Sequence, residues 1–416
     1  MASTTRDLDV VLFGATGFVG ELTAAHLRDH APAGLRVALA GRSRARLDAV
    51  AERLGGVAAE WERVVLDASD GPACDALAAR TRVLATTVGP YARHGREVVR
   101  ACAEAGTHYA DLTGEVLFVH DVADAFHELA GRTGARIVPS CGFDSVPSDL
   151  GVWLTAQAAR ERGLGELTTT TLSVRRMRGG LSGGTIDSMR QQAIAAREDE
   201  TARRTVADPY GLSPDRAAEP APRSRGGSSP LSRVTRAIPV RRTDEGRWTG
   251  PFVMASYNTR VVRRTNALLG YAYGRDFRYQ EVSDFGRSRT APLKAVAMTA
   301  GLLGVAGGMA FGPTRAVLDR VLPEPGQGPS EETRERGMFA MEVVAGTTSG
   351  QQVRTRVGAP YDPGYNGTAI MLGQAALCLA LDELDSPGGV LTPAAAMAEP
   401  LAERLRGFDF ELEVQD

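Results

Sequence analysis

Three glycines near the start of the chain have the spacing of a loop that binds a dinucleotide. Gly14, Gly17 and Gly20 lie in VVLFGATGFVGEL, where an apolar run precedes the glycines and a helical pattern follows them. Glycines let backbone N–H groups approach a pyrophosphate, and the start of the following helix adds its positive dipole. We therefore predict that this loop, with Thr16 and Phe18, binds the phosphates of a dinucleotide.

The segment AGRSRARL, which follows the second apolar run, predicts which dinucleotide binds. NAD-specific proteins usually carry an acidic residue here to bind the ribose hydroxyls, whereas this chain has Arg42. A guanidinium can pair with a 2′-phosphate through two hydrogen bonds, and Ser43 and Arg46 can add further donors. The sequence therefore favours NADP(H) over NAD(H), although Arg42 could also simply begin a basic helix.

Two further turns are expected to contact the dinucleotide. Asp67 follows the third apolar run, where related folds contact the adenine, and Val88, Gly89 and Pro90 follow the fourth. Ligands of parallel sheets bind beyond the carboxyl ends of the strands, which places the second turn beside the nicotinamide ribose. A turn-forming role alone would explain either segment nearly as well.

Transfer of a hydride from such a dinucleotide is commonly accompanied by transfer of a proton, which needs an acid. The titratable or hydroxyl side chains at the expected strand ends are Tyr91, Tyr109, Asp111, Glu115, Cys141 and Asp144. We select Tyr91, Asp144 and Cys141 as catalytic candidates, with Tyr91 first, because a tyrosine hydroxyl can polarise a carbonyl and relay a proton. Asp144 could equally cap a turn, and Cys141 could be a small buried side chain. The histidines lack metal-ligand spacing, so we expect no metal site.

Strands and helices that could position these residues alternate along residues 1–149. Six strand-like segments are separated by helical patterns: Val10–Phe13, Val37–Ala40, Val64–Leu66, Val83–Thr87, His108–Leu112 and Ala135–Pro139. This alternation predicts an α/β fold, in which a doubly wound parallel sheet of the Rossmann type forms the nucleotide-binding domain.

The alternation stops after residue 149, and a second domain of mixed α+β structure is expected over 150–363. Its predicted strands are Leu167–Met177, Phe252–Thr265, Phe277–Val282 and a hairpin over Met338–Val357. Residues 208–247 are rich in Pro, Arg, Ser and Gly, which predicts a mobile loop. The apolar helical pattern that begins residues 364–416 should return to the Rossmann domain, so that the second domain is an insertion.

Composition excludes some classes of partner and favours one compartment. The 416 residues carry 48 basic and 50 acidic side chains, a net charge of −2, so no global field attracts nucleic acid. Four scattered cysteines suggest a reduced, cytoplasmic protein. Ala295–Gly312 has no charged residue, and a buried or interface helix is the main expectation there. A peripheral contact with the plasma membrane is the alternative.

The motifs GATGFVG, AGRS, TTVGPY, YADLTGE and CGFDSVPSDLG, with SGGTIDSM and DPYGLSP beyond them, resemble the saccharopine dehydrogenase-like family. Within it, nearly the whole chain is similar to the trans-acting enoyl reductases of actinobacterial polyketide and lipid synthesis. The resemblance implies NADPH-dependent reduction of a carbon–carbon double bond in an enoyl thioester held by a carrier protein or CoA, in trans with a polyketide synthase. Gly14, Gly17, Gly20 and Arg42 match the family's nucleotide motif, whereas no catalytic acid can be transferred. We also expect a homodimer.

Two alternative functions stay open at this point. A saccharopine-type amino-acid dehydrogenase would need arginines and lysines around the nicotinamide to bind several carboxylates, whereas an enoyl reductase needs an apolar site. A non-catalytic, nucleotide-binding protein associated with a membrane would bind NADPH without oxidising it. If a carrier protein docks, Arg260, Arg263 and Arg264 could contact its acidic surface, although a solvated strand edge would explain these arginines equally well.

Overall fold

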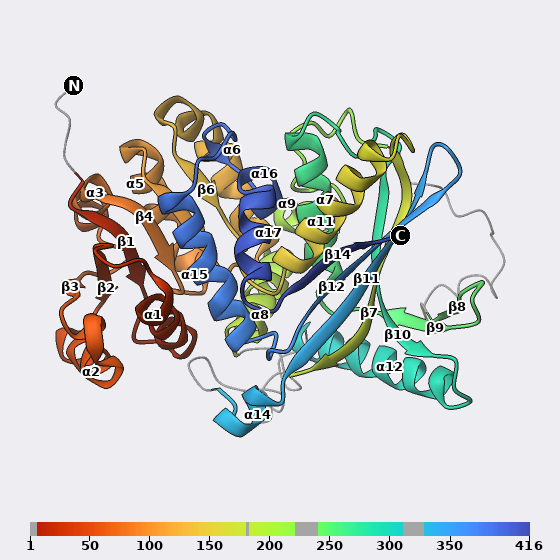
Figure 1. Cartoon of the computed structure of the whole chain (residues 1–416), viewed down its shortest axis with the longest axis horizontal. Coiled ribbons are helices and arrows are strands. Elements are labelled where there is room, and N and C mark those ends of the chain that lie inside the picture. Colours follow the sequence, from red (N-terminus) through yellow and green to blue (C-terminus); the bar gives the residue numbers. More distant parts are fainter. Residues whose placement is uncertain (1–5, 180–182, 221–239, 311–327) are drawn as a thin grey trace.

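The computed structural model describes residues 6–179, 183–220, 240–310 and 328–416, which form two sheets joined by helices. Figure 1 shows one sheet on each side of the molecule, with α15, α16 and α17 between them. Residues 221–239 of the predicted mobile loop, and residues 311–312 at the end of the uncharged stretch, lie outside the described residues.

The first sheet has seven parallel strands in the order β13-β6-β5-β4-β1-β2-β3. The six predicted strands are confirmed as β1 (Leu8–Phe13), β2 (Val37–Gly41), β3 (Glu62–Val65), β4 (Thr81–Thr86), β5 (His108–Asp111) and β6 (Arg136–Val138). Both faces are covered: Val10 and Leu12 of β1 contact one hydrophobic core, and Val11 and Phe13 contact the other. The Rossmann-type α/β fold is therefore confirmed.

Helices on both faces cover this sheet. They are α1 (Phe18–His30), α2 (Arg44–Leu54), α3 (Gly71–Arg80), α4 (Tyr91–His94), α5 (Arg96–Ala105) and α6 (Val116–Thr133), with a short 3-10 turn at Gly56–Ala59. The chain then leaves the sheet through α7 (Val146–Glu161), which packs against strands of the second sheet. Both sheets therefore share the core that α7 helps to form.

The C-terminal residues contribute to both sheets. Helix α15 (Asn366–Leu381) packs on α1 and β4, as expected for a helix that returns to the Rossmann domain. Strand β13 (Gly389–Val390) then adds a seventh strand to the first sheet, followed by α16 (Pro393–Ala396) and α17 (Ala398–Arg406). However, β14 (Glu411–Gln415) pairs with β12 of the second sheet, so residues 364–416 are not a purely helical segment on the Rossmann domain.

The second sheet is mixed, in the order β14-β12-β11-β7-β10-β9-β8. Its other strands are β7 (Leu167–Arg178), β8 (Arg241–Arg242), β9 (Trp248–Pro251), β10 (Arg278–Gly286), β11 (Met338–Thr347) and β12 (Gln352–Ala359). β11 and β12 form the predicted hairpin, and Gly350 in its turn has a φ of 84°. The left-handed φ at this turn favours glycine.

The predicted strand Phe252–Thr265 is wrong, because this segment is largely the helix α11 (Ala255–Leu268). Its Val and Thr residues favour strands in isolation, but Tyr257, Val261 and Thr265 are buried at a helical spacing. Tertiary packing of this face thus overrides the local preference.

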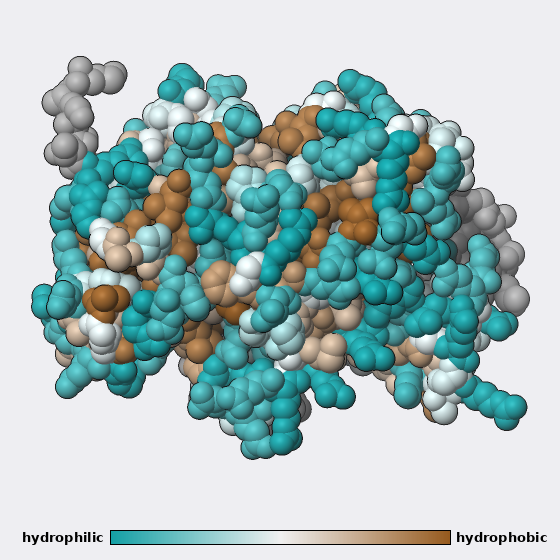
Figure 2. Space-filling view, viewed as in Figure 1, coloured by the Kyte–Doolittle hydropathy of each residue, from teal (hydrophilic) through white to brown (hydrophobic). Residues whose placement is uncertain are grey.

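The other helices within the described residues are α8 (Gly183–Glu198), α9 (Glu200–Ala207), α12 (Ala291–Ala310) and α14 (Glu331–Glu335). Helix α12, which contains most of the uncharged stretch, packs on β9 and β10 at the edge of the second sheet. None of the helices in the described ranges combines the length and hydropathy that crossing a bilayer requires. Figure 2 shows a largely hydrophilic surface on the viewed face, with hydrophobic residues visible mainly in the hollows between elements.

Candidate active site

The glycine loop is held rigidly between β1 and β4. Gly14 has a φ of 91°, and a Cβ there would lie 2.7 Å from the Thr87 hydroxyl oxygen. A Cβ on Gly20 would lie 2.1 Å from the Gly14 carbonyl oxygen, so only glycine fits without movement of the backbone. The Gly17 amide donates to the same carbonyl at 2.9 Å, and Thr87 donates to it at 3.1 Å. The loop therefore brings the uncapped start of α1 to the carboxyl end of the sheet.

The adenosine-side candidates gather where β2 and β3 end. The Leu66 amide donates to the Gly41 carbonyl, which places Asp67 and Arg42 just beyond adjacent strand ends. Hydrogen bonds from Ser69, together with the charge of Arg42, lower the pKa of Asp67, which keeps this carboxylate ionised. Arg42 and Arg46 are exposed.

Ser43 and Thr16 complete this side of the predicted site. Ser43 is the N-cap of α2 and accepts a hydrogen bond from the Arg46 amide at 3.4 Å, so its hydroxyl already has a structural role. Thr16 lies beside Gly41, between the glycine loop and β2. A glycine cradle at one end and an exposed arginine at the other fit a dinucleotide with a 2′-phosphate.

A cleft of about 1070 Å³, partly open to solvent, continues from the glycine loop to the second domain. Phe18, Gly89 and Pro90 line it, whereas the Val88 side chain packs behind Gly14 and is absent from the lining. None of the described residues that line the cleft is an arginine or a lysine. The described residues that line the cleft are Gly17, Phe18, Val19, Gly20, Thr87, Gly89, Pro90, Tyr91, Leu112, Gly114, Gly142, Phe143, Asp144, Gly183, Gly184, Asp187, Ser188, Gly364, Tyr365 and Thr368.

Tyr91 lines the cleft, but its hydroxyl is already hydrogen-bonded to two backbone groups. The hydroxyl donates to the Thr86 carbonyl and accepts from the Leu112 amide, each at 3.2 Å. Burial and the nearby carboxylate of Asp111 raise its pKa well above the usual value of a tyrosine. Tyr91 therefore holds two strand ends together and is a poor proton donor in this arrangement.

Asp144 lines the same cleft and has the properties of an acid. Burial raises its pKa from 3.8 to about 7, and no compensating interaction opposes this effect. Among the described residues, no hydrogen-bond donor reaches its carboxylate. Its proton is therefore available near neutral pH, beside Gly114 and the turn that follows β6.

Cys141 does not belong to this cleft. Its side chain is fully buried, and its thiol lies 3.3 Å from the Val138 carbonyl, to which it donates. Burial raises the pKa of this thiol well above its usual value. We therefore no longer consider Cys141 a catalytic candidate. The structure instead supports the alternative interpretation, in which Cys141 is a small buried residue of the core.

Of the other strand-end candidates, Glu115 is the one that organises the site. Its carboxylate, 2% exposed, accepts from the Tyr91 amide at 2.9 Å and from the Ala92 amide at 2.8 Å. The Ser188 hydroxyl, from α8 of the second domain, also donates to it at 2.7 Å. Glu115 therefore fixes the Gly-Pro turn and ties the two domains together at the cleft.

Asp111 and Tyr109 form a second buried group behind the cleft. Asp111 accepts from the amides of Thr113 and Ser140, while the Tyr109 hydroxyl donates to it at 2.8 Å. Burial raises the pKa of Asp111 to about 7. Since Asp111 is absent from the cleft lining, we interpret it as a support for the loops after β5 and β6.

The three arginines of α11 are unavailable to a partner protein, contrary to the prediction. Arg260 and Arg264 are 7% and 3% exposed. Their guanidinium groups donate to backbone carbonyls of residues 206–212, and Arg263 donates to the carbonyls of Pro209 and Tyr279. Backbone carbonyls accept from the terminal guanidinium nitrogens of these arginines and from the Nε atom of Arg260, whereas the Nε atoms of Arg263 and Arg264 have no hydrogen-bond partner among the described residues. The cluster therefore stabilises the turn after α9 through the hydrogen bonds to these carbonyls.

Comparisons with known proteins agree with this geometry. Residues 10–138 match the family model of the saccharopine dehydrogenase NADP binding domain. The chain is 48% identical over 415 residues to a candidate trans-acting enoyl reductase of Mycobacterium tuberculosis, covering 97% of both chains. It is 46% identical to the trans-acting enoyl reductase of Mycobacterium bovis, covering 98% of this chain and 97% of that one.

Among solved structures, the chain is similar to saccharopine dehydrogenase (L-Glu forming) of Saccharomyces cerevisiae, with a TM-score of 0.53 and 13% identity. That match covers 98% of this chain and 99% of the yeast chain. At this level of identity the likeness concerns the fold alone.

Proposed function

Because the chain belongs to the family of the trans-acting enoyl reductases and carries a saccharopine dehydrogenase-type NADP-binding domain, we propose that it reduces the double bond of an enoyl thioester. The chain is an NADP-dependent oxidoreductase. The proposed substrate is a polyketide or fatty acyl chain on a carrier protein or CoA, supplied in trans by a polyketide synthase.

The character of the cleft is the observation that carries this proposal. Phe18, Leu112, Phe143 and Tyr365 give it an apolar wall, and its described lining contains no arginine or lysine. A saccharopine-type substrate would bring several carboxylates, and burying them without cations would cost several kcal/mol per charge. The apolar wall instead suits an acyl chain, which favours the enoyl reductase over the amino-acid dehydrogenase.

NADPH, when bound by the glycine loop and Arg42, supplies the hydride that the β-carbon of the enoyl group receives. We assign the proton for the α-carbon to Asp144, in place of Tyr91, because the Asp144 carboxyl faces the cleft with no competing hydrogen bond among the described residues. Tyr91 and Glu115 act as positioning residues, since they hold the turn that forms one wall of the cleft. The apolar wall limits the access of water to the reacting carbons.

The proposal extends to the setting in which the enzyme works. We infer a cytoplasmic protein that acts as a homodimer, and the four free, buried cysteines are compatible with a reducing compartment. Sedimentation of the purified protein over a range of concentrations tests the dimer.

A substrate panel separates the alternatives. Purified protein is mixed with NADPH and, in turn, an enoyl-CoA thioester, a ketoacyl thioester and the 2-oxoglutarate and amine pair of a saccharopine-type reaction. We expect loss of NADPH fluorescence with the enoyl thioester. Faster oxidation with the 2-oxoglutarate and amine pair would assign amino-acid chemistry, and tight NADPH binding without oxidation by any substrate would favour the non-catalytic alternative.

A further inference from the structure

Helix α12 carries an apolar surface that the fold leaves uncovered. Leu293 is 71% exposed and Leu303 is 57% exposed, and Val296 and Met298 are also exposed. The opposite face is packed: the Thr299 hydroxyl and the Ala295 carbonyl lie against Gly250 of β9. Large side chains exposed along one helix are uncommon on a surface without a partner.

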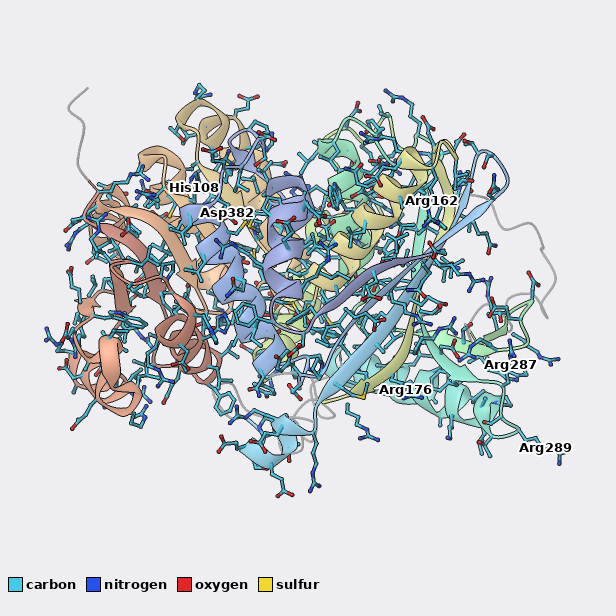
Figure 3. The ribbon with its side chains drawn as sticks, in the orientation of Figure 1. His108, Arg162, Arg176, Arg287, Arg289 and Asp382 are labelled. Atoms are coloured by element: carbon cyan, nitrogen blue, oxygen red, sulfur yellow. The ribbon has the colours of Figure 1, made fainter. Side chains whose placement is uncertain are left out.

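Positive charge surrounds the start of this helix. Arg287, Arg289 and Lys294 are exposed, and the sequence contains no Asp or Glu between residues 285 and 318. Figure 3 shows Arg287 and Arg289 projecting away from the body of the protein near α12. This local excess of cations contrasts with the net charge of −2 of the whole chain.

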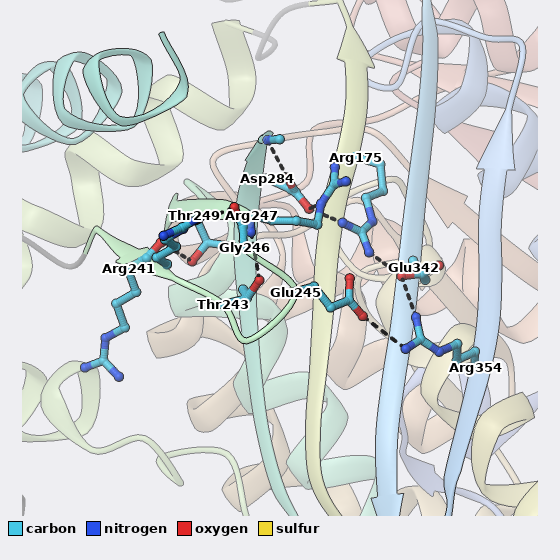
Figure 4. A network of polar contacts seen from close by, with 12 residues as sticks. Arg175, Arg241, Thr243, Glu245, Gly246, Arg247, Thr249, Asp284, Glu342 and Arg354 are labelled. Atoms are coloured by element: carbon cyan, nitrogen blue, oxygen red, sulfur yellow. Dashed lines mark hydrogen bonds and ion pairs between the residues drawn. The ribbon is translucent and has the colours of Figure 1, made fainter. Parts of the chain in front are cut away.

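Arginines on the second sheet itself, unlike those beside α12, are paired with carboxylates. Figure 4 shows Arg175 between Asp284 and Glu342, with Arg247 donating to Asp284 at 2.6 Å. Those charges are neutralised within the sheet. By contrast, no carboxylate of the described residues lies within ion-pair distance of Arg287, Arg289 or Lys294.

We propose that the α12 surface, defined as the exposed side of Ala291–Leu303 with Arg287 and Arg289, binds peripherally to an anionic lipid bilayer. The apolar side chains would enter the boundary between headgroups and acyl chains, while the three cations contact lipid phosphates. A second copy of the chain would bring no carboxylate on this surface to balance the cations. The proposal is independent of the enoyl reductase activity.

Vesicle flotation of the full-length protein tests this surface. Vesicles of phosphatidylcholine alone are compared with vesicles that also contain phosphatidylglycerol. From the usual contribution of one basic side chain, we expect the three cations to make binding to the anionic vesicles on the order of 100-fold tighter, and added salt to release the protein. Arg287→Glu/Arg289→Glu and Leu293→Asp/Leu303→Asp should each abolish flotation.

Arg132→Glu/Arg160→Glu is the matched control, because it makes the same change of charge at exposed positions on α6 and α7. This control should float like the wild type, and all variants should bind NADPH unchanged, which shows that they are folded. The proposal is overturned if the wild type does not float with anionic vesicles, or if Arg287→Glu/Arg289→Glu floats as well as the control. A dimer that Leu293→Asp/Leu303→Asp disperses, without any flotation, would assign the surface to a second copy.

Discussion

Replacement of Asp144 by asparagine should remove the acid from the cleft and also change how stability depends on pH. The rise of its pKa from 3.8 to about 7 corresponds to about 4 kcal/mol, at 1.36 kcal/mol per pKa unit. A raised pKa means that the folded protein holds this proton more tightly than the unfolded chain. The ionised carboxylate therefore destabilises the fold progressively as the pH rises from about 4 to about 7, and fully above that range.

Urea unfolding of the wild type and of Asp144→Asn between pH 5 and pH 9 would measure this effect. The other buried acids contribute equally to both proteins, so the difference between the two free energies of unfolding reports Asp144 alone. The variant should gain about 3 kcal/mol of stability relative to the wild type between pH 5 and pH 9, because the part of the titration below pH 5 lies outside this range. A stability difference that does not change with pH would refute the assignment of a partly buried carboxyl with a raised pKa at this position.

The same pair of proteins tests the chemical role. With the enoyl thioester, kcat/KM of the wild type should fall above about pH 7, where Asp144 loses its proton, and Asp144→Asn should be about 100-fold slower without this fall. Asp187→Asn is the matched control, since Asp187 also lines the cleft but lies 3.5 Å from Arg190. Loss of the fall above pH 7 in the control, or its persistence in Asp144→Asn, would show that another group supplies the proton.

Three further substitutions probe the cofactor site and the cleft. Arg42→Glu should weaken NADPH binding by roughly 10- to 100-fold in a fluorescence titration, because a charged hydrogen bond contributes about 1.5–3 kcal/mol, while NADH binding should change little. The control Arg44→Ala, which breaks an ion pair with Asp48, should leave both affinities unchanged. Gly20→Ala should abolish NADPH binding or lower the melting temperature, since its Cβ would lie 2.1 Å from the Gly14 carbonyl oxygen. The control is Gly301→Ala, whose Cβ meets no atom within 4 Å. Unchanged NADPH binding and an unchanged melting temperature of Gly20→Ala would contradict the description of the loop. Glu115→Gln should lower kcat more than it changes NADPH affinity and should cost about 1–3 kcal/mol of stability, because a side-chain amide cannot accept from all the donors that surround this carboxylate. An unchanged kcat would mean that the Gly-Pro turn does not need the hydrogen bonds of Glu115.

Local patterns were sufficient to predict the glycine loop and the strands of the first sheet. The glycines between a strand and a helix specify the loop through short-range sterics, and the apolar runs specify six strands, of which β1, in the interior of the sheet, is buried on both faces. Arg42 likewise follows a strand directly. The order of these elements then places their carboxyl ends at one edge of the sheet, as expected for a parallel arrangement.

The parts that depend on long-range contacts could not be predicted. Glu115 and Ser188 are 73 residues apart, and nothing local indicates that a serine of α8 donates to a buried carboxylate. The structure leads us to propose Asp144 ahead of Tyr91 as the acid, because the Tyr91 hydroxyl is hydrogen-bonded to two backbone groups, and the sequence does not reveal these bonds. Strand β14, which crosses to the second sheet, depends on pairing with β12.

The most direct test of the proposed reaction follows the hydrogen that NADPH donates. The protein is incubated with an enoyl-CoA thioester and NADPH carrying deuterium at the reactive position of the nicotinamide, and the product is examined by mass spectrometry and NMR. We predict a saturated thioester with deuterium at the β-carbon and a solvent-derived hydrogen at the α-carbon. A product with deuterium on the carbonyl carbon or on a carbon bonded to nitrogen would contradict the assignment, as would an unchanged enoyl thioester under conditions where NADPH binds.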